Sequence, residues 1–189
     1  GELSWRPQGS VYQLRLEGRI ALIGAVLTQI SQGRIEPAGL VPARFTDRRL
    51  RRAEQAAVFD RDAGRVTFAG RSTQRPWAPG MQDRLSWMVQ LPGIAQADPA
   101  RVRTGASIVL RVVGARGDVK LWTLRSQGVH SVRVGGRSVA AVKLVRERDD
   151  PDDTLAEVWL DPQRQHLPVR ARLTDGDSDA LELLLQPGA

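Results

Sequence analysis

Cysteine is absent from the 189-residue chain, and histidine occurs only twice, as His130 and His166. Without cysteine there can be no disulfide, no thiolate nucleophile and no Cys/His zinc site. No window holds 18 uncharged apolar residues, and the best apolar run, Ile20–Ile30, is too short and too rich in β-branched residues to span a bilayer. We therefore expect no metal site and no transmembrane helix.

Lysine is also scarce, because only Lys120 and Lys143 are lysines among the 28 basic residues. The formal net charge is +7, but an arginine-rich, lysine-poor chain with abundant Ala, Gly and Val is typical of a GC-rich genome. A phosphate-binding surface usually mixes both cations, so we expect no nucleic-acid partner. The densest basic group is Arg44, Arg48, Arg49, Arg51 and Arg52. It is interpreted as a solvated face or, alternatively, as a site for anionic polysaccharide or lipid.

Hydrophobic residues make up 41% of the chain and charged residues 26%, which are ordinary values for a folded protein. The length predicts a single domain over residues 1–189, with an ordered core at about 10–186. Because the chain begins at Gly1 rather than at methionine, we expect any signal peptide to have been removed already.

Alternating apolar and polar residues indicate a mainly β protein. Tyr12, Leu14 and Leu16 alternate with polar residues, which is the period of a strand with one solvent-exposed face. The pair Gly135-Gly136 is a strong signal for a hairpin turn. About eleven strands with short connections are expected, mostly antiparallel. So many strands rarely form a flat sheet, which predicts a strongly curled antiparallel sheet or open barrel. An unclosed sheet has edge strands, through which a dimer could form.

One short helix is predicted over residues 82–91, with Leu85, Met88 and Val89 on one stripe and Pro92 as its end. Such an amphipathic helix could plug the mouth or the concave face of a curled sheet. The segment Thr46–Ala57 fits either a helix or a strand, and the strand is favoured because Arg51–Phe59 could pair with Arg65–Ala69.

Catalytic patterns are weak, so no catalytic residue and no cofactor are predicted. Glu157 and Asp161 would stand about 13 Å apart on a strand, which is wide for a cooperating pair of carboxylates. Ser86 and Asp83 could form a hydrolase site with a histidine, but no GxSxG, GxGxxG or Walker pattern occurs. A capped helix start or a buried hydrogen bond explains Asp83 and Ser86 better.

The five tryptophans, dispersed over different elements, lead to the main functional hypothesis. In a curled sheet, large rings together with Leu and Met would form either core or the wall of a binding site. The candidate residues for an apolar or amphiphilic ligand, or a partner segment, are Trp87, Trp122, Trp159, Met88 and Leu85. We therefore expect a non-enzymatic binding protein, with polyanion binding as the alternative and hydrolysis third.

Five segments, taken in order, resemble the bacterial domain-of-unknown-function family 3108: Gly39–Phe45, Phe59–Val66, Gln82–Leu91, Glu157–Leu160 and Leu167–Arg170. The first resembles the family's Gly-Leu-x-Pro-x-x-Phe block. The resemblance implies an exported protein of the Gram-negative periplasm or envelope, and it implies no activity and no functional residues. The expected architecture is also similar to the open barrels of periplasmic lipoprotein carriers, an analogy of fold alone.

Overall fold

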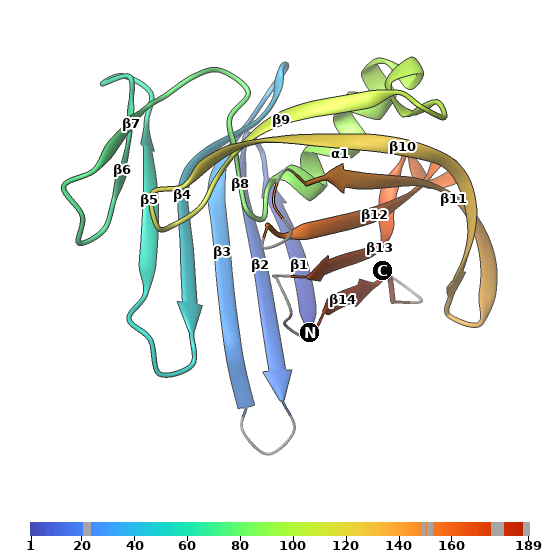
Figure 1. Ribbon diagram of the computed structural model, residues 1–189, viewed down its shortest axis with the longest axis horizontal. Helices are drawn as coiled ribbons and strands as arrows, with labels where there is room; N and C mark the ends of the chain where they lie inside the picture. The colour runs from blue at the N-terminus through green and yellow to red at the C-terminus, as the bar shows by residue number, and fades with distance from the viewer. Residues whose placement is uncertain (21–23, 149, 151–152, 175–179, 187–189) are drawn as a thin grey trace. The chain divides into compact units, whose positions relative to one another are not determined.

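The computed structural model describes residues 1–20, 24–148, 150, 153–174 and 180–186 (Figure 1). Within these residues the protein is mainly β, as predicted, with 62% strand and 10% helix. None of the helices in these ranges is long and apolar enough to cross a membrane. The elements are β1 (Glu2–Gln8), β2 (Val11–Ile20), β3 (Gly24–Glu36), β4 (Gly39–Arg49), β5 (Gln55–Asp60), β6 (Arg65–Phe68), β7 (Gln74–Pro76), β8 (Gln82–Asp83), α1 (Trp87–Ala97), η1 (Pro99–Val102), β9 (Ser107–Val113), β10 (Val119–Val134), β11 (Arg137–Glu147), β12 (Leu155–Asp161), η2 (Pro162–Arg164), β13 (Leu167–Thr174) and β14 (Leu181–Leu184).

The chain forms two compact units, each built from two segments. Unit 1 comprises Gly1–Trp87 and Leu110–Leu121, and unit 2 comprises Met88–Val109 and Trp122–Ala189. Unit 1 contains sheet A, in which the strands β1 to β7 lie side by side in chain order and every neighbouring pair is antiparallel. Such a meander is the expected result of short hairpin connections.

Sheet A has one buried and one exposed face. On β2, Tyr12, Leu14 and Leu16 are buried whereas Arg15 between them is exposed, as the alternation predicted. The β3–β4 pairing contains a bulge beside Gly33, where a Cβ atom would lie 2.2 Å from the Val41 carbonyl oxygen. Only glycine allows the two backbones to approach this closely.

Sheet B has the order β14-β13-β12-β11-β10-β9-β8 and curls strongly into a half-barrel. Its β10–β11 hairpin turns at Gly135-Gly136, as predicted, and Figure 1 shows both strands bending toward that turn. The short β8 pairs with β9 in parallel. In unit 2, buried side chains near the hairpin turn form a hydrophobic cluster of Val132, Ala141, Trp159 and Val169.

The described residues form fourteen strands rather than the expected eleven. β1, β7 and β8 were not predicted from the sequence. β1 (ELSWRPQ) has no clear alternation, and β7 and β8 have three and two residues, too few for a periodic pattern to show.

The helix begins at Trp87 rather than Gln82 and passes through Pro92 to Ala97, so the predicted bounds of 82–91 were wrong. The Asp83 carboxylate accepts hydrogen bonds from the backbone N–H groups of Leu85 and Ser86, which holds a turn before the helix. Beyond Pro92, Ala95 is fully buried. We infer that burial of this last turn offsets the hydrogen bond that proline cannot make.

The segment Thr46–Ala57 forms strand at both ends and no helix. β4 continues to Arg49, and β5 begins at Gln55 and pairs with β6, which agrees with the favoured interpretation. Between them Arg51 adopts a left-handed backbone with a φ of 57°. This turn had no glycine or asparagine to reveal it in the sequence.

Candidate functional site

The candidate site is the apolar face of sheet B within unit 2. The register places five large side chains on this face, all nearly or fully buried: Trp122, Leu124, Leu144, Val158 and Leu160. Residues two apart on a strand point the same way, and Leu144 pairs with Val158 across β11 and β12. The result is a largely hydrophobic surface on a curled sheet.

α1 is connected to this apolar face through η1, which follows it directly. Ser126, on the same face of β10, donates from its hydroxyl to the Val102 carbonyl oxygen at 2.8 Å. A second contact joins α1 to the loop before β13, where the Gln96 amide lies 3.4 Å from His166 Nδ1. Met88, Leu91 and Ala95 form a stripe that is almost completely buried. We infer that this stripe covers the apolar face.

α1 is a weak helix by its own sequence. Pro92 and Gly93 both stand in its interior, where they cost about 3 and about 1 kcal/mol relative to alanine. Its first turn has no acidic residue and its last turn no basic residue, so its dipole is not balanced. Burial of its stripe is therefore the main force that holds it in place.

The predicted ligand-binding residues do not all share one surface. Trp122 lies on the apolar face and Met88 on α1, whereas Trp159 pairs with Lys143 and points to the opposite face of sheet B. Leu85 and Trp87 belong to unit 1, where both are fully buried. Sequence alternation separates Trp159 from Val158 and Leu160, but only the register shows that Trp122 shares their face.

On the opposite face of sheet B, Trp159 lies between two cations. Lys143 Nζ is 5.1 Å and the Arg170 guanidinium carbon 4.7 Å from the ring centroid. Each cation also has an acidic partner, Glu157 for Lys143 at 2.7 Å and Glu182 for Arg170 at 2.6 Å. The charges are balanced, so this arrangement stabilises the sheet and leaves no net charge for a ligand.

Glu157 and Asp161 are both largely buried. Asp161 accepts a hydrogen bond from the Gln163 backbone and begins η2. Both carboxylates therefore have structural partners.

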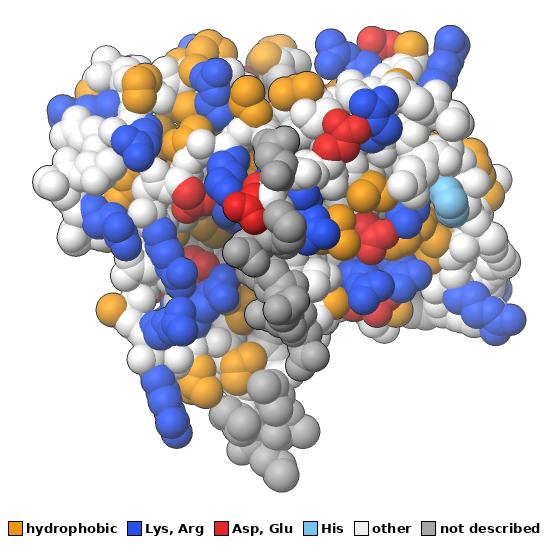
Figure 2. Space-filling view, in the orientation of Figure 1, with side chains coloured by type: hydrophobic (Ala, Val, Ile, Leu, Met, Phe, Trp, Pro, Cys, Tyr) orange, Lys and Arg blue, Asp and Glu red, His pale blue; other side chains and the backbone are white. Residues whose placement is uncertain are grey.

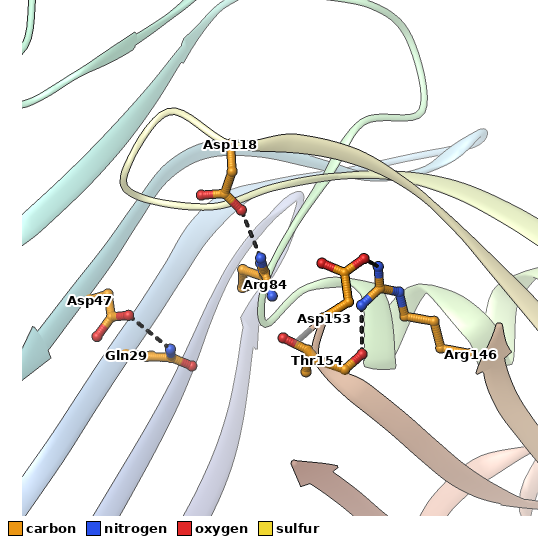
Figure 3. A network of polar contacts seen from close by, with 7 residues as sticks. All are labelled: Gln29, Asp47, Arg84, Asp118, Arg146, Asp153 and Thr154. Carbon is orange, nitrogen blue, oxygen red and sulfur yellow. Dashed lines mark hydrogen bonds and ion pairs between the residues drawn. The ribbon is translucent and has the colours of Figure 1, made fainter. Parts of the chain in front are cut away.

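Arg146 is a buried charge that the sequence analysis missed. Its side chain is 2% exposed and bonds Asp153 at 2.9 Å and the Thr154 carbonyl oxygen at 2.5 Å (Figure 3). Its guanidinium carbon also lies 4.5 Å from the centroid of the Trp122 ring. Alternation could have revealed it, because Arg146 continues the apolar row of Val142 and Leu144.

A buried polar cluster in unit 1 contains the candidate hydrolase residues. Ser31 donates to Asp83 Oδ2 at 2.5 Å, and the Tyr12 hydroxyl lies 3.1 Å from Ser31 Oγ. The Asp83 backbone N–H donates to Ser86 Oγ at 2.9 Å. These bonds confirm that Asp83 and Ser86 belong to a capped turn with buried hydrogen bonds.

Burial raises the pKa of the Asp83 carboxyl to about 6, although Ser31 and two backbone N–H groups stabilise its charged form. The pKa of Tyr12 is also raised, first by burial and then by the negative charge of Asp83. Both histidines lie in unit 2, where His130 is exposed and His166 contacts Gln96. In the described part of the chain, neither histidine forms a hydrogen bond with Asp83 or Ser86, and no group of three metal-ligating side chains occurs.

The arginine cluster divides among three places. Arg44 and Arg48 are exposed on the outer face of β4, with Arg44 4.0 Å from Glu54. Arg49 points to the other face, 3.5 Å from Asp47 Oδ1, and Asp47 also bonds Gln29 (Figure 3). Arg51 and Arg52 are exposed on the turn. The five side chains therefore do not lie on one face of β4, because Arg49 points away from Arg44 and Arg48.

A model of the family described as "Protein of unknown function (DUF3108)" matches residues 1–185 of this chain. The protein belongs to the DUF3108 family. This confirms the resemblance inferred from the sequence, and the match spans both units of the DUF3108 chain. The chain matches no curated protein and no solved structure.

Proposed function

We propose that this DUF3108 protein is a non-enzymatic, periplasmic or envelope-associated binding protein. Its ligand is an apolar or amphiphilic molecule, or a partner segment, held on the apolar face of sheet B. The observation that carries the proposal is a largely apolar half-barrel face together with a helix that has Pro92 and Gly93 in its interior and a buried apolar stripe, which we infer to cover that face. The envelope location is supported by the resemblance to exported proteins described above.

A ligand can bind here only if α1 moves off the apolar face, so the free energy needed to displace the helix sets the ease of binding. The stripe of Met88, Leu91 and Ala95 is almost completely buried, and we infer that it covers the apolar face in the absence of ligand. An apolar ligand can replace that stripe with little loss of hydrophobic burial, since burial depends on area and not on direction. A helix with low intrinsic stability costs less to displace than an ideal helix, so Pro92 and Gly93 favour exchange.

Gly93→Ala is expected to stabilise α1 and weaken ligand binding. Gly93 is exposed, has no left-handed backbone, and a Cβ atom there would meet nothing within 4 Å. Alanine should therefore add about 1 kcal/mol to the helix and raise the Tm by about 2–4 °C. The affinity for N-phenyl-1-naphthylamine, followed by fluorescence titration, should fall about fivefold because binding must now displace a stronger helix.

Gln165→Gly is the matched control. Gln165 is exposed in the same unit and has a left-handed backbone with a φ of 54°, so glycine relieves strain there without touching α1. It should raise the Tm and leave the probe affinity unchanged. A Gly93→Ala variant with a higher Tm and unaltered affinity would contradict displacement of the helix.

The ligand itself can be sought by organic-solvent extraction of protein purified from its native envelope, followed by mass spectrometry. A stoichiometric lipid or amphiphile in the extract is expected. If gentle purification repeatedly gives an empty extract and the fluorescent probe also fails to bind, the proposed function is wrong.

A further inference from the structure

One end of sheet A combines exposed arginines with exposed apolar side chains. We call it the basic end and define it by Arg19 on β2, residues 25–27 on β3, and Arg48–Arg52 at the end of β4 and the following turn. The register brings these segments together, because Arg19 pairs with Ala25 and Leu27 pairs with Arg49. The Leu50 backbone N–H also donates to the Val26 carbonyl oxygen at 2.8 Å.

The basic end carries an excess of positive charge. Two of its arginines have acidic partners, Glu17 for Arg19 and Asp47 for Arg49. The other three, Arg48, Arg51 and Arg52, are exposed and make no ion pair among the described residues. These three cations lie within five positions of one another, so they present a local positive field to solvent.

Apolar side chains lie among these arginines. Leu50 is 46% exposed between Arg49 and Arg51, Ala25 is exposed, and Val26 is half-buried. Figure 2 shows Lys and Arg side chains at the lower end of the molecule with hydrophobic side chains between them. Exposed leucine surrounded by cations is the combination that interfacial membrane-binding segments use.

We propose that the basic end docks on the surface of an anionic phospholipid bilayer. Arg48, Arg51 and Arg52 would contact lipid phosphates, and Leu50 would enter the boundary between headgroups and acyl chains. Charge complementarity favours an anionic partner, and the exposed leucine favours a lipid layer over a hydrated polysaccharide. This surface is built from other residues than the apolar face of sheet B, and the proposal does not depend on the proposed function.

Flotation with lipid vesicles tests the proposal. The protein should bind vesicles of phosphatidylcholine and phosphatidylglycerol (3:1) and should not bind phosphatidylcholine alone. Binding should weaken between 50 and 300 mM salt, since exposed charges are screened. The triple variant R48Q/R51Q/R52Q should lose on the order of a hundredfold in affinity, about fivefold for each arginine.

The matched control is R65Q/R71Q/R75Q, which removes the same charge from exposed arginines elsewhere in unit 1. It should lose at most a few-fold in affinity, because electrostatic attraction falls off within a Debye length of about 8 Å. Leu50→Ser should lose about fivefold while keeping the salt dependence. N-phenyl-1-naphthylamine binding and the circular dichroism spectrum should be unchanged in all three variants, which shows that each remains folded.

Three results would overturn the proposal. Equal losses in the two triple variants would mean that only net charge matters. Unaltered vesicle binding by Leu50→Ser would mean that the leucine does not enter the bilayer and that charge alone accounts for the binding. Absence of binding to the anionic vesicles at 50 mM salt would exclude the membrane itself.

Discussion

Arg146→Met is expected to lower the free energy of unfolding by about 3–5 kcal/mol. The side chain of Arg146 is almost completely buried, and it satisfies the Asp153 carboxylate and the Thr154 carbonyl oxygen while lying over Trp122. Methionine fills part of the volume but removes the Arg146 cation from the largely buried Asp153 carboxylate, and a less balanced charge is expensive to keep out of water. Urea denaturation at neutral pH measures the loss.

Arg125→Met provides the control on the neighbouring strand. Arg125 pairs with Glu147, but both side chains are about half exposed, so the loss should stay below about 1 kcal/mol. Adding Asp153→Ala to Arg146→Met should recover part of the stability, because the carboxylate that Arg146 balanced is then removed. Equal losses at Arg125 and Arg146 would show that the burial of Arg146 has no energetic consequence.

Stability should fall as the pH rises from about 4 to about 6, by about 3 kcal/mol from Asp83 alone. Burial raises the pKa of this carboxyl from 3.8 to about 6 in the folded protein, so the folded state binds a proton more tightly than the unfolded state. The stabilisation is complete below pH 4 and is lost as the pH passes 6. A difference of about 2 pKa units corresponds to about 3 kcal/mol at 1.36 kcal/mol each.

Asp83→Asn isolates this effect. The amide oxygen can still accept from Leu85 and Ser86, and the amide nitrogen can donate to Ser31, so the turn should be retained. The difference in unfolding free energy between the two proteins should change by about 3 kcal/mol between pH 4 and 7. Asp62→Asn, on an exposed turn of the same unit, is the control. Parallel curves for wild type and Asp83→Asn would contradict the burial of a charge at Asp83.

Local sequence patterns predicted those strands and turns whose characteristic pattern lies within a few consecutive residues. The alternation around Leu14 and the Gly135-Gly136 turn are examples, since the period of two and the left-handed glycines are visible in a few residues. The apolar run Ile20–Ile30 is divided between two strands, because Ile20 ends β2 and Gly24 begins β3. Residues 21–23 lie outside the described part of the chain.

Long-range contacts could not be predicted in this way. Ser31 and Asp83 are separated by 52 positions, and nothing in either local sequence indicates that the two side chains meet. The same holds for the division of the arginine cluster, because it depends on which face of β4 each residue occupies. Of the predicted site residues, Met88 lies on α1, and the place of Trp122 on the apolar face depends on a register that only the structure provides.

Because unit 1 takes its last segment from residues 110–121, its order of assembly during synthesis is constrained. When Trp87 has just been made, β8 has no strand to pair with, since Val112 and Val113 are not yet translated. Arg84 likewise lacks Asp118, its 2.7 Å partner (Figure 3). At about 5–20 residues per second, a ribosome needs roughly 2–7 s to add the 34 residues from 88 to 121. A nascent chain of this protein therefore remains incompletely folded for seconds, a period in which a chaperone could hold it.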